Sequence, residues 1–439
     1  MIRFDVATAG PLLARIPKFR GGGRLRSARG LLTSRMQAAV GDQCAILRPD
    51  GECVFAEVIG FADDTAYLLP YDRADSLQPD LPVLRLGRRL HIPAGPSTLG
   101  RVLDALGRPI DGKGPLIDCQ PWPVSVSPPP PLKRARIRTP FVTGIRAIDG
   151  LLTCGRGQRV GIFAGSGVGK STLLGEIAKG AESDVNVIAL IGERGREVAP
   201  FIEDCLGETG LRRSTVLVAT CEESPLMRVR AASSAVALAD YYRASGANVL
   251  LLMDSMTRLA MAQREIGILL GEPPTSRGYT PSVFQLLAQI VESLGNSDQG
   301  GVTALLTVLV DGDDFEEPIS DAVRSLVDGH IVLDRKIAER GRFPAIDVLR
   351  SVSRIASDLV DAEHRLAATR FRSILGTYAE VRDLVRIGVY VRGSSPAIDR
   401  ACDLMPAIER FLRQDVNERS TWAATRKALL ELTSGWTDP

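Results

Sequence analysis

The middle of the chain alternates short apolar runs with longer segments of helical periodicity. Six runs place hydrophobic residues at consecutive positions: Val160–Phe163, Val185–Ile191, Thr215–Ala219, Val249–Met253, Val302–Val310 and His330–Leu333. Continuous apolar runs are typical of strands buried on both faces, and such strands belong to parallel sheets covered by helices. Residues 140–350 are therefore predicted to form a parallel α/β sheet.

The flanking regions have different patterns. Over residues 23–94, short β-like runs alternate with turn signals such as Pro49-Asp50-Gly51, which predicts a small β-barrel domain. A connector over 95–139 contains four consecutive prolines at 128–131, a stiff extended linker. It leads into a core domain that spans 95–350 with the connector included. Strand signals fade after 350, and the segments Ser351–Glu380 and Ala407–Leu432 predict helices in a C-terminal domain over 351–439.

Composition narrows the class of protein. A chain of 439 residues with 45% hydrophobic and 24% charged residues fits a soluble globular protein of several domains. A net charge of +2 gives no global attraction to nucleic acid or membrane. Seven cysteines without CxxC spacing and three scattered histidines argue against a disulfide framework or a zinc site, which favours a reducing cytoplasm. The apolar stretches near the start are too short for a signal peptide or membrane span.

The first 22 residues form a basic segment that runs into Gly21-Gly22-Gly23. Residues 1–30 carry seven lysines or arginines against one acid, Asp5. Such a segment is either a solvated tail or a docking segment for an acidic partner or anionic lipid. We carry the docking interpretation forward as an expectation for residues 1–22.

A glycine-rich turn joins the first apolar run of the core to a helical pattern that begins at Leu173. Its predicted ligand-binding residues are Gly165, Ser166, Gly167, Val168, Gly169, Lys170, Ser171 and Thr172. Glycines let backbone N–H groups point inward at an anion, and the following helix adds its positive end. Lys170 is expected to reach the β- and γ-phosphates, and the Ser171 hydroxyl to coordinate Mg²⁺. Ala164 stands where the strict pattern has glycine, but the turn itself is made by three later glycines. The motif predicts binding of a nucleoside triphosphate.

Two carboxylates follow apolar runs of the predicted sheet. Asp254 ends the run Val249–Met253, as a Walker B aspartate does to face Mg²⁺; a strand-capping acid is the alternative interpretation. Glu193 follows Val185–Ile191, at a sheet edge where ligands of open α/β proteins bind, so it is a candidate base toward an attacking water. Its neighbour Arg194 is a candidate brace for Glu193 or phosphate. A solvated charge cluster is the alternative for both.

Two further residues are candidates with ordinary alternatives. Arg354 follows the predicted sheet and is a candidate arginine finger that acts across a subunit interface; a surface arginine is the alternative. Phe343 is a candidate for stacking against adenine, although a lone phenylalanine is usually a core or interface aromatic.

Several segments resemble one family. Residues Leu99–Gly112 resemble the connector of rotary ATPase catalytic subunits and their relatives. Five further segments resemble the type III export ATPases: Pro131–Ile137, Thr143–Leu152, Glu223–Arg228, Gly271–Tyr279 and Asp311–Asp314. The last of these, together with Ala338–Ala345, looks more like the flagellar export ATPase than the injectisome enzyme. The resemblance covers nearly the whole chain beyond about residue 25.

The resemblance implies a RecA-like P-loop core that uses ATP and Mg²⁺. It implies that Glu193 is the catalytic carboxylate with Arg194 beside it, that Asp254 is the Walker B acid, and that Lys170 and Ser171 act as described above. Arg354 matches a finger supplied in trans, which implies a homohexamer. Phe343 takes the place of an aromatic against adenine, and Phe411 is implied to complete that pocket from the C-terminal domain.

The resemblance also implies partners and place. A stator-like regulatory protein is expected at the N-terminus, with a stalk-like coiled-coil protein, export chaperone–substrate complexes and the membrane export gate as further partners. The expected place is the cytoplasm, peripheral to the inner-membrane export apparatus. Gly393–Asp399 stands where the ATP synthase β subunit has an acidic loop, so coupling to a stalk through that charged loop is in doubt.

Four alternatives stay open on the sequence. An injectisome ATPase is the nearest alternative to the flagellar one. A rotary ATP synthase-type catalytic subunit is disfavoured by the missing acidic loop. An RNA-translocating ring ATPase needs aromatic and basic stacking positions, and the barrel segment has few aromatics, so no nucleic acid partner is expected. A non-catalytic nucleotide-binding subunit is disfavoured by the presence of Glu193.

Overall fold

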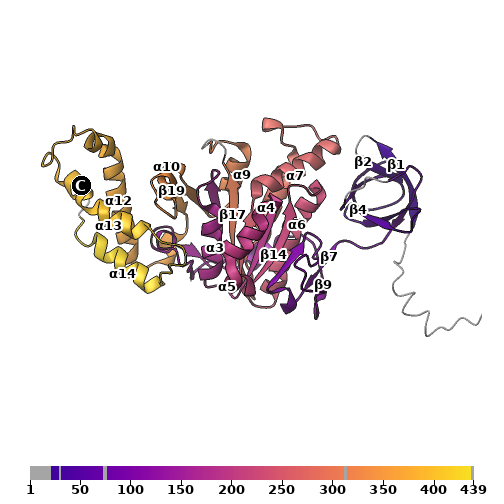
Figure 1. The fold of residues 1–439 in the computed structure, drawn as a ribbon, viewed down its shortest axis with the longest axis horizontal. Helices are drawn as coiled ribbons and strands as arrows, with labels where there is room; N and C mark the ends of the chain where they lie inside the picture. Colours follow the sequence, from indigo (N-terminus) through magenta and orange to yellow (C-terminus); the bar gives the residue numbers. More distant parts are fainter. Residues whose placement is uncertain (1–20, 29–30, 73–76, 311–313, 437–439) are drawn as a thin grey trace, which may run out of the picture.

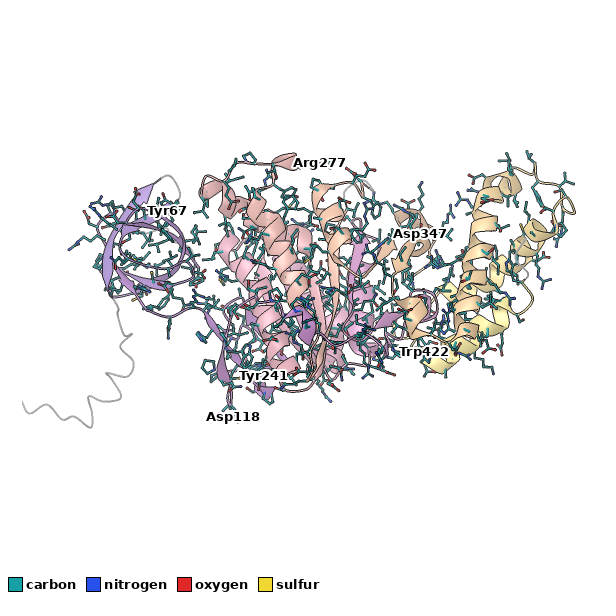
Figure 2. The ribbon with its side chains drawn as sticks, turned by 180° about the vertical axis from the view of Figure 1, so that it is seen from behind. Tyr67, Asp118, Tyr241, Arg277, Asp347 and Trp422 are labelled. Carbon is teal, nitrogen blue, oxygen red and sulfur yellow. The ribbon has the colours of Figure 1, made fainter. Side chains whose placement is uncertain are left out.

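The computed structural model describes residues 21–28, 31–72, 77–310 and 314–436. A six-stranded barrel, a sheet covered by helices and a C-terminal helical region follow one another along the long axis (Figure 1). The view from behind shows Tyr67 in the barrel and Trp422 in the C-terminal helices at opposite ends (Figure 2). The predicted α/β architecture with its two flanking regions is confirmed. The basic segment over 1–22 lies, except for its last two residues, outside the described residues.

The barrel closes in the strand order β1-β2-β5-β4-β3-β6. Its strands are β1 (Gly22–Ala28), β2 (Leu31–Arg35), β3 (Gln43–Leu47), β4 (Cys53–Ala62), β5 (Thr65–Pro70) and β6 (Pro82–Arg85). Small and aliphatic side chains such as Ile46, Val58 and Leu68 fill its interior. The barrel ends earlier than the expected residue 94, because β7 (His91–Ala94) pairs with β9 (Gln120–Pro123) beside the core instead.

The core sheet runs in the order β19-β18-β12-β17-β15-β13-β14-β8, with β16 paired to β17. All six predicted runs are strands of this sheet: β12 (Arg159–Ala164), β13 (Val185–Glu193), β14 (Ser214–Thr220), β15 (Asn248–Asp254), β17 (Gly301–Leu309) and β18 (Gly329–Leu333). These six are parallel to their neighbours among the six. Parallel pairing brings their carboxyl ends to one edge, where the ligand crevice of such sheets lies.

The edge strands are those that the sequence did not predict. β8 (Arg101–Asp104) lies in the expected connector and pairs in parallel with β14. β19 (Ile346–Ser353) pairs antiparallel with β18, and β16 (Gly295–Asn296) with β17. β19 therefore extends past residue 351, so Ser351–Ser353 form a strand rather than the start of the expected helix. β8 and β16 are short, and β19 carries Asp347 and Arg350 within its length, so none of the three gives a long apolar run in the sequence.

Two hydrophobic layers sandwich the sheet. On one face, side chains such as Val187 and Leu251 pack under helices α6, α7, α8 and α9. On the other face, Ile188 and Leu250 pack with helices α2, α3 and the C-terminal helices. The helices of these layers are α2 (Arg146–Leu151), α3 (Lys170–Gly180), α6 (Pro225–Ala244), α7 (Met256–Leu269), α8 (Pro281–Ser293) and α9 (Pro318–Leu326). Side chains at alternate positions of one strand point into opposite hydrophobic layers, so every position of the strand is apolar and the run is continuous.

The C-terminal region consists of α11 (Ala356–Leu359), α12 (Ala362–Arg386), α13 (Pro396–Leu412) and α14 (Trp422–Thr433). The expected helix over Ala407–Leu432 is instead parts of two helices, because residues 413–421 form a loop in which Asn417 has a φ of 67°. Thr421 then caps α14 by accepting a hydrogen bond from the Ala424 N–H. No described helix is both long enough and apolar enough to cross a membrane.

Short elements complete the description. They are η1 (Pro96–Thr98), η2 (Pro131–Lys133), β10 (Pro140–Phe141), β11 (Cys154–Gly155), α4 (Gly195–Pro200), η3 (Phe201–Leu206), α5 (Gly207–Arg212), η4 (Ser276–Gly278) and α10 (Arg335–Glu339). The run α4-η3-α5 follows the carboxyl end of β13 and packs on α3. It therefore borders the same sheet edge as the predicted ligand crevice.

Candidate active site

The glycine-rich turn lies between β12 and α3, as predicted. Ala164 is the last residue of β12 and Lys170 the first of α3. Gly167 and Gly169 have φ values of 76° and 84°, which side chains with a Cβ rarely adopt. Ala164 itself is a buried strand residue that pairs with Leu309 and Leu333, so a Cβ is accommodated there. The turn thus wraps over the start of a helix whose first N–H groups are free for an anion.

Three charged side chains meet at the carboxyl ends of the strands. The Lys170 Nζ lies 2.5 Å from Asp254 Oδ1 and 3.8 Å from Glu193 Oε1. Thr307, on β17 between β12 and β15, donates its hydroxyl to the same Asp254 oxygen at 2.7 Å. Asp254 and Glu193 end β15 and β13, so parallel pairing of these neighbouring strands sets both carboxylates beside the lysine.

Glu193 is the carboxylate of this cluster that has a buried oxygen without a hydrogen bond. Its Oε1 is buried and accepts no hydrogen bond from the residues that the structure describes. Burial raises the pKa of Glu193 above its ordinary value, and the nearby Asp254 charge raises it further, while Lys170 lowers it. A carboxylate with a raised pKa and a free oxygen is a suitable proton acceptor.

The two arginines near Glu193 differ in orientation. Arg194 is largely exposed, with 60% of its side chain accessible, and pairs with Glu197 at 3.1 Å. In this structure it therefore does not brace Glu193. Arg258, on α7, contributes a positive charge that lowers the Glu193 pKa, and its Nε is buried without a hydrogen-bond partner among the described residues. Gly192 allows this approach, since a Cβ there would lie 2.9 Å from the Arg258 Cβ.

Arg258 is a site residue that the sequence reasoning missed. The signal was available, because Ser255 caps α7 and Arg258 lies in its first turn, directly after the strand that ends in Asp254. The Ser255 side chain accepts the Arg258 backbone N–H, which fixes where this turn begins. A cation in the turn after a Walker B position is therefore placed beside the carboxylates by the fold.

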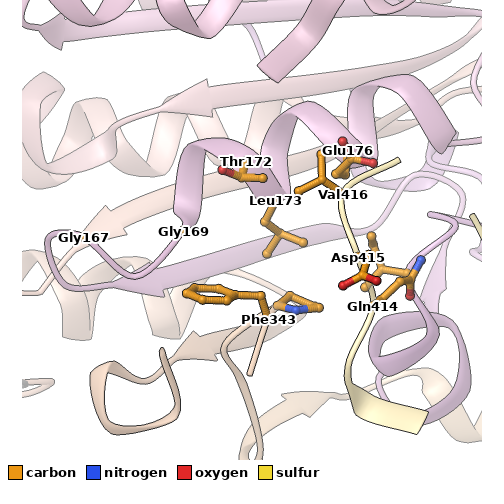
Figure 3. Close-up of a pocket in the computed structure, with 11 residues that line it drawn as sticks. Gly167, Gly169, Thr172, Leu173, Glu176, Phe343, Gln414, Asp415 and Val416 are labelled. Carbon is orange, nitrogen blue, oxygen red and sulfur yellow. The ribbon is translucent and has the colours of Figure 1, made fainter. Parts of the chain in front are cut away.

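A pocket of about 420 Å³ opens beside the glycine turn (Figure 3). Phe343 forms part of its wall, and a Cβ on Gly169 would lie 3.3 Å from the Phe343 ring. Its lining residues are Ile145, Gly167, Gly169, Thr172, Leu173, Glu176, Phe343, Pro344, Gln414, Asp415 and Val416. A flat ring stacked on Phe343 would therefore lie beside the glycine turn.

Phe411 lies elsewhere. Its ring is buried and packs against Phe371, with 5.3 Å between ring centroids, and it does not line the pocket. The C-terminal wall is instead formed by Gln414, Asp415 and Val416, in the loop after α13. The expectation for Phe411 named the right neighbourhood of the chain, but in this structure that ring belongs to the hydrophobic core.

Arg354 lies at the opposite edge of the sheet from its own glycine turn. It follows Ser353, which pairs with Gly329, and Gly329 pairs with Val160 at the start of β12. The turn follows the far end of that strand, about 16 Å away for a strand of six residues. Arg354 is exposed, and its Nη2 donates to the Arg324 carbonyl at 3.3 Å. So placed, Arg354 does not reach the phosphate loop of its own chain.

Comparisons with known proteins agree along the chain. Residues 144–353 match the nucleotide-binding domain of the ATP synthase alpha/beta family, and residues 360–431 match the T3SS EscN ATPase C-terminal domain. A flagellum-specific ATP synthase of Bacillus subtilis (strain 168) is 49% identical over 415 residues, which cover 94% of this chain and 95% of that protein. The chain belongs to the type III export ATPase family. A type 3 secretion system ATPase of Xanthomonas euvesicatoria is 47% identical over 405 residues, 92% of this export ATPase and 91% of that protein.

Solved structures extend the match to the whole arrangement of the export ATPase. The assembled ATPase EscN from the enteropathogenic E. coli type III secretion system matches with a TM-score of 0.89 and 40% identity, over 94% of this chain and 100% of that one. EscN in complex with its central stalk EscO matches with a TM-score of 0.87 and 40% identity, over the same shares. The relative placement of barrel, sheet and C-terminal helices is therefore shared with a solved ATPase.

Proposed function

We propose that this export ATPase hydrolyses ATP with Mg²⁺ to energise type III protein export. The observation that carries the proposal is the convergence of Lys170, Glu193 and Asp254 beside the glycine turn, with one buried Glu193 oxygen free. Phosphoryl transfer to water needs a phosphate cradle, a metal and a group that orients the water. Each of these has a candidate side chain in the cluster.

The roles follow from position. The backbone of the turn from Gly165 to Gly169 and the Lys170 ammonium hold the phosphates. Glu193 orients the attacking water and accepts its proton at the free oxygen. Ser171 and Asp254 present oxygen donors of the kind that Mg²⁺ prefers and would hold it, Asp254 through water; bound there, the metal would neutralise charge on the phosphates. Phe343 stacks against adenine.

We further propose that the working enzyme is a homohexameric ring. Arg354 faces away from its own turn and lies too far from it to serve the phosphates of its own chain. A head-to-tail ring sets that edge of one subunit against the nucleotide edge of the next. Arg354 then serves as the finger for the neighbour, and Arg194 contributes where the subunits meet.

The partners and place are proposed from the family. One solved relative is in complex with its central stalk, which supports a stalk-like coiled-coil partner here. A stator-like regulatory protein at the N-terminus, chaperone–substrate complexes that are released and unfolded, and a membrane export gate complete the set. The place is the cytoplasmic side of the inner-membrane export apparatus. We favour flagellar assembly, with an injectisome as the alternative, since a flagellum-specific relative matches at 49% identity and a type 3 secretion system relative at 47%.

The test is Glu193→Gln, which keeps the shape and removes the base. Steady-state turnover should fall by roughly 10²- to 10⁴-fold while ATP affinity, measured by equilibrium titration with Mg²⁺ present, is retained. Glu208→Gln, on an exposed acid of α5 that pairs with Arg212, is the matched control and should leave turnover unchanged. Equal turnover in Glu193→Gln and wild type would remove Glu193 from the chemistry.

A further inference from the structure

Two donors share one oxygen of Asp254. The Lys170 Nζ lies 2.5 Å from Asp254 Oδ1, and the Thr307 hydroxyl donates to the same oxygen at 2.7 Å. The other oxygen, Oδ2, accepts no hydrogen bond from the described residues. Asp254 is only 4% exposed, so these two contacts hold the orientation of its carboxylate. The two donors differ in origin, because Lys170 belongs to the phosphate loop and Thr307 to the sheet.

Thr307 lies on β17, the strand between β12 and β15. Met253 of β15 pairs with Leu306, so the next position along the two strands brings Thr307 beside Asp254. Both side chains point to the face of the sheet that α3 covers. The sheet, rather than the phosphate loop, therefore sets the position of this hydroxyl.

The Thr307 hydroxyl serves Asp254 alone in the described part of the chain. Thr307 is fully buried in a strand whose other positions are almost all apolar, and its one hydrogen bond among the described residues goes to that carboxylate. Valine has nearly the same shape, and it avoids the free energy that burying a hydroxyl costs. A polar group in such a place points to a requirement at Asp254 rather than to the packing of β17.

Lys170 has a second task in the proposed function, because its ammonium holds the phosphates of the nucleotide. An ammonium that turns to the phosphates gives up part of its contact with Asp254 Oδ1, whereas Thr307 keeps its place in β17. The last torsion of an aspartate side chain is soft, so a carboxylate without a fixed donor turns readily. Thr307 is then the donor that keeps Oδ1 engaged and leaves Oδ2 free.

We propose, on the basis of that function, that Thr307 is a positioning residue that holds the Asp254 carboxylate for Mg²⁺ while Lys170 holds the phosphates. Thr307 acts through Asp254 and touches neither the metal nor the nucleotide. Mg²⁺ keeps several of its waters and demands strict geometry, so a carboxylate that turns freely serves it less well. Groups that orient the ligands of a metal are typically worth roughly 10- to 100-fold in metal affinity.

The experiment compares nucleotide binding with and without the metal. The non-hydrolysable analogue AMPPNP is titrated into the full-length protein in EDTA and in saturating Mg²⁺. Thr307→Val keeps the shape and removes the hydroxyl, so the affinity in Mg²⁺ should fall roughly tenfold while the affinity in EDTA stays at the wild-type level. Thr307→Ser keeps the hydroxyl and should restore the affinity in Mg²⁺. Without nucleotide, Thr307→Val should unfold in denaturant as wild type does, because Lys170 still pairs with Asp254.

Thr303→Val is the matched control. Thr303 is a buried threonine of the same strand, but its hydroxyl accepts the Gly157 N–H, so its loss should leave the affinity in Mg²⁺ unchanged. If the valine variant at Thr307 fails to fold, Thr307→Ala takes its place, and the same loss is expected of it.

The outcomes separate this role from the proposed function. Equal affinities of Thr307→Val and wild type in Mg²⁺ would overturn the role of Thr307 and leave the proposed function intact. Equal weakening in EDTA and in Mg²⁺ would show a purely structural role and overturn it as well. Wild type that binds AMPPNP no better with Mg²⁺ than in EDTA would overturn the metal-dependent function itself, and the role of Thr307 with it.

Discussion

Two glutamates in this chain, Glu193 and Glu57, have opposite surroundings. Glu193, at the nucleotide edge, has one oxygen without a hydrogen bond and lies 3.8 Å from Lys170. Glu57, in the barrel strand β4, is 1% exposed and has both oxygens occupied. Its Oε2 accepts from Arg230 Nε at 2.8 Å and from the Tyr71 hydroxyl at 2.9 Å, and its Oε1 accepts from the other guanidinium branch.

The difference lies in where the completing arginine comes from. Glu57 takes its arginine from α6 of the same chain, so the junction of barrel and core is finished when the chain folds. The cluster around Glu193 is, as proposed, completed by ATP, Mg²⁺ and Arg354 of a neighbour. A buried carboxylate whose oxygens are all hydrogen-bonded stabilises the fold, whereas one with an oxygen lacking a hydrogen bond can accept a proton or bind a ligand. Variants that remove one partner from either cluster therefore test this difference.

The largest effect is expected from Arg354→Ala. Loss of an arginine finger costs roughly 10³-fold or more in turnover, and here ATP affinity of each chain should persist, because Arg354 is remote from its own site. Mixed rings of Arg354→Ala and Lys170→Ala chains should regain part of the turnover, since some interfaces then combine two intact halves. Arg382→Ala, at a partly exposed arginine on α12, is the control. Verified mixed rings without any recovery would contradict action in trans.

The next effect falls on stability. Arg230→Met leaves Glu57 buried without its charge partner, and breaking such a pair costs about 3–5 kcal/mol of unfolding free energy. The double variant with Glu57→Leu should recover much of that loss. Arg212→Met removes a pair with Glu208 that is exposed on both sides and should leave the unfolding free energy close to that of wild type. Denaturant unfolding measures the free energy of unfolding of all three variants. If Arg230→Met loses no more stability than Arg212→Met, the Glu57–Arg230 pair does not stabilise the junction of barrel and core.

The sequence predicts the cluster around Glu193 better than the cluster around Glu57. Lys170, Glu193 and Asp254 were predictable, because a glycine turn and two strand ends are local patterns and parallel pairing brings them together. The junction was not, since Glu57 and Arg230 are 173 residues apart and each is an ordinary charged residue within its own segment. The same limit explains Phe411 and Asp415. The resemblance implied that Phe411 of the C-terminal domain completes the pocket, but the geometry of the loop after α13 decides which side chains line it.

A pH effect of intermediate size is expected at Glu193. Its pKa is raised by burial and by Asp254, so the folded state favours the neutral form and Glu193 stabilises the fold fully only below the ordinary value of 4.5. That contribution is lost as pH rises through the raised pKa. Without nucleotide, Glu193→Gln should therefore gain stability over wild type as pH rises above 4.5, and the gap should close on acidification. A gap independent of pH would contradict the raised pKa.

The smallest effect is expected from Tyr71→Phe. Burial and the Glu57 charge raise the Tyr71 pKa, so its phenol stays protonated and donates to Glu57. Phenylalanine keeps the ring that fills the junction and removes one donor, while Arg230 still serves both Glu57 oxygens, so the loss should be about 1 kcal/mol. Tyr67→Phe, on a half-buried ring of β5, is the control. If the two tyrosine variants unfold alike, Arg230 alone satisfies Glu57. If Tyr71→Phe approaches the loss in Arg230→Met, the three groups form one cooperative network, and the junction is as interdependent as the active site.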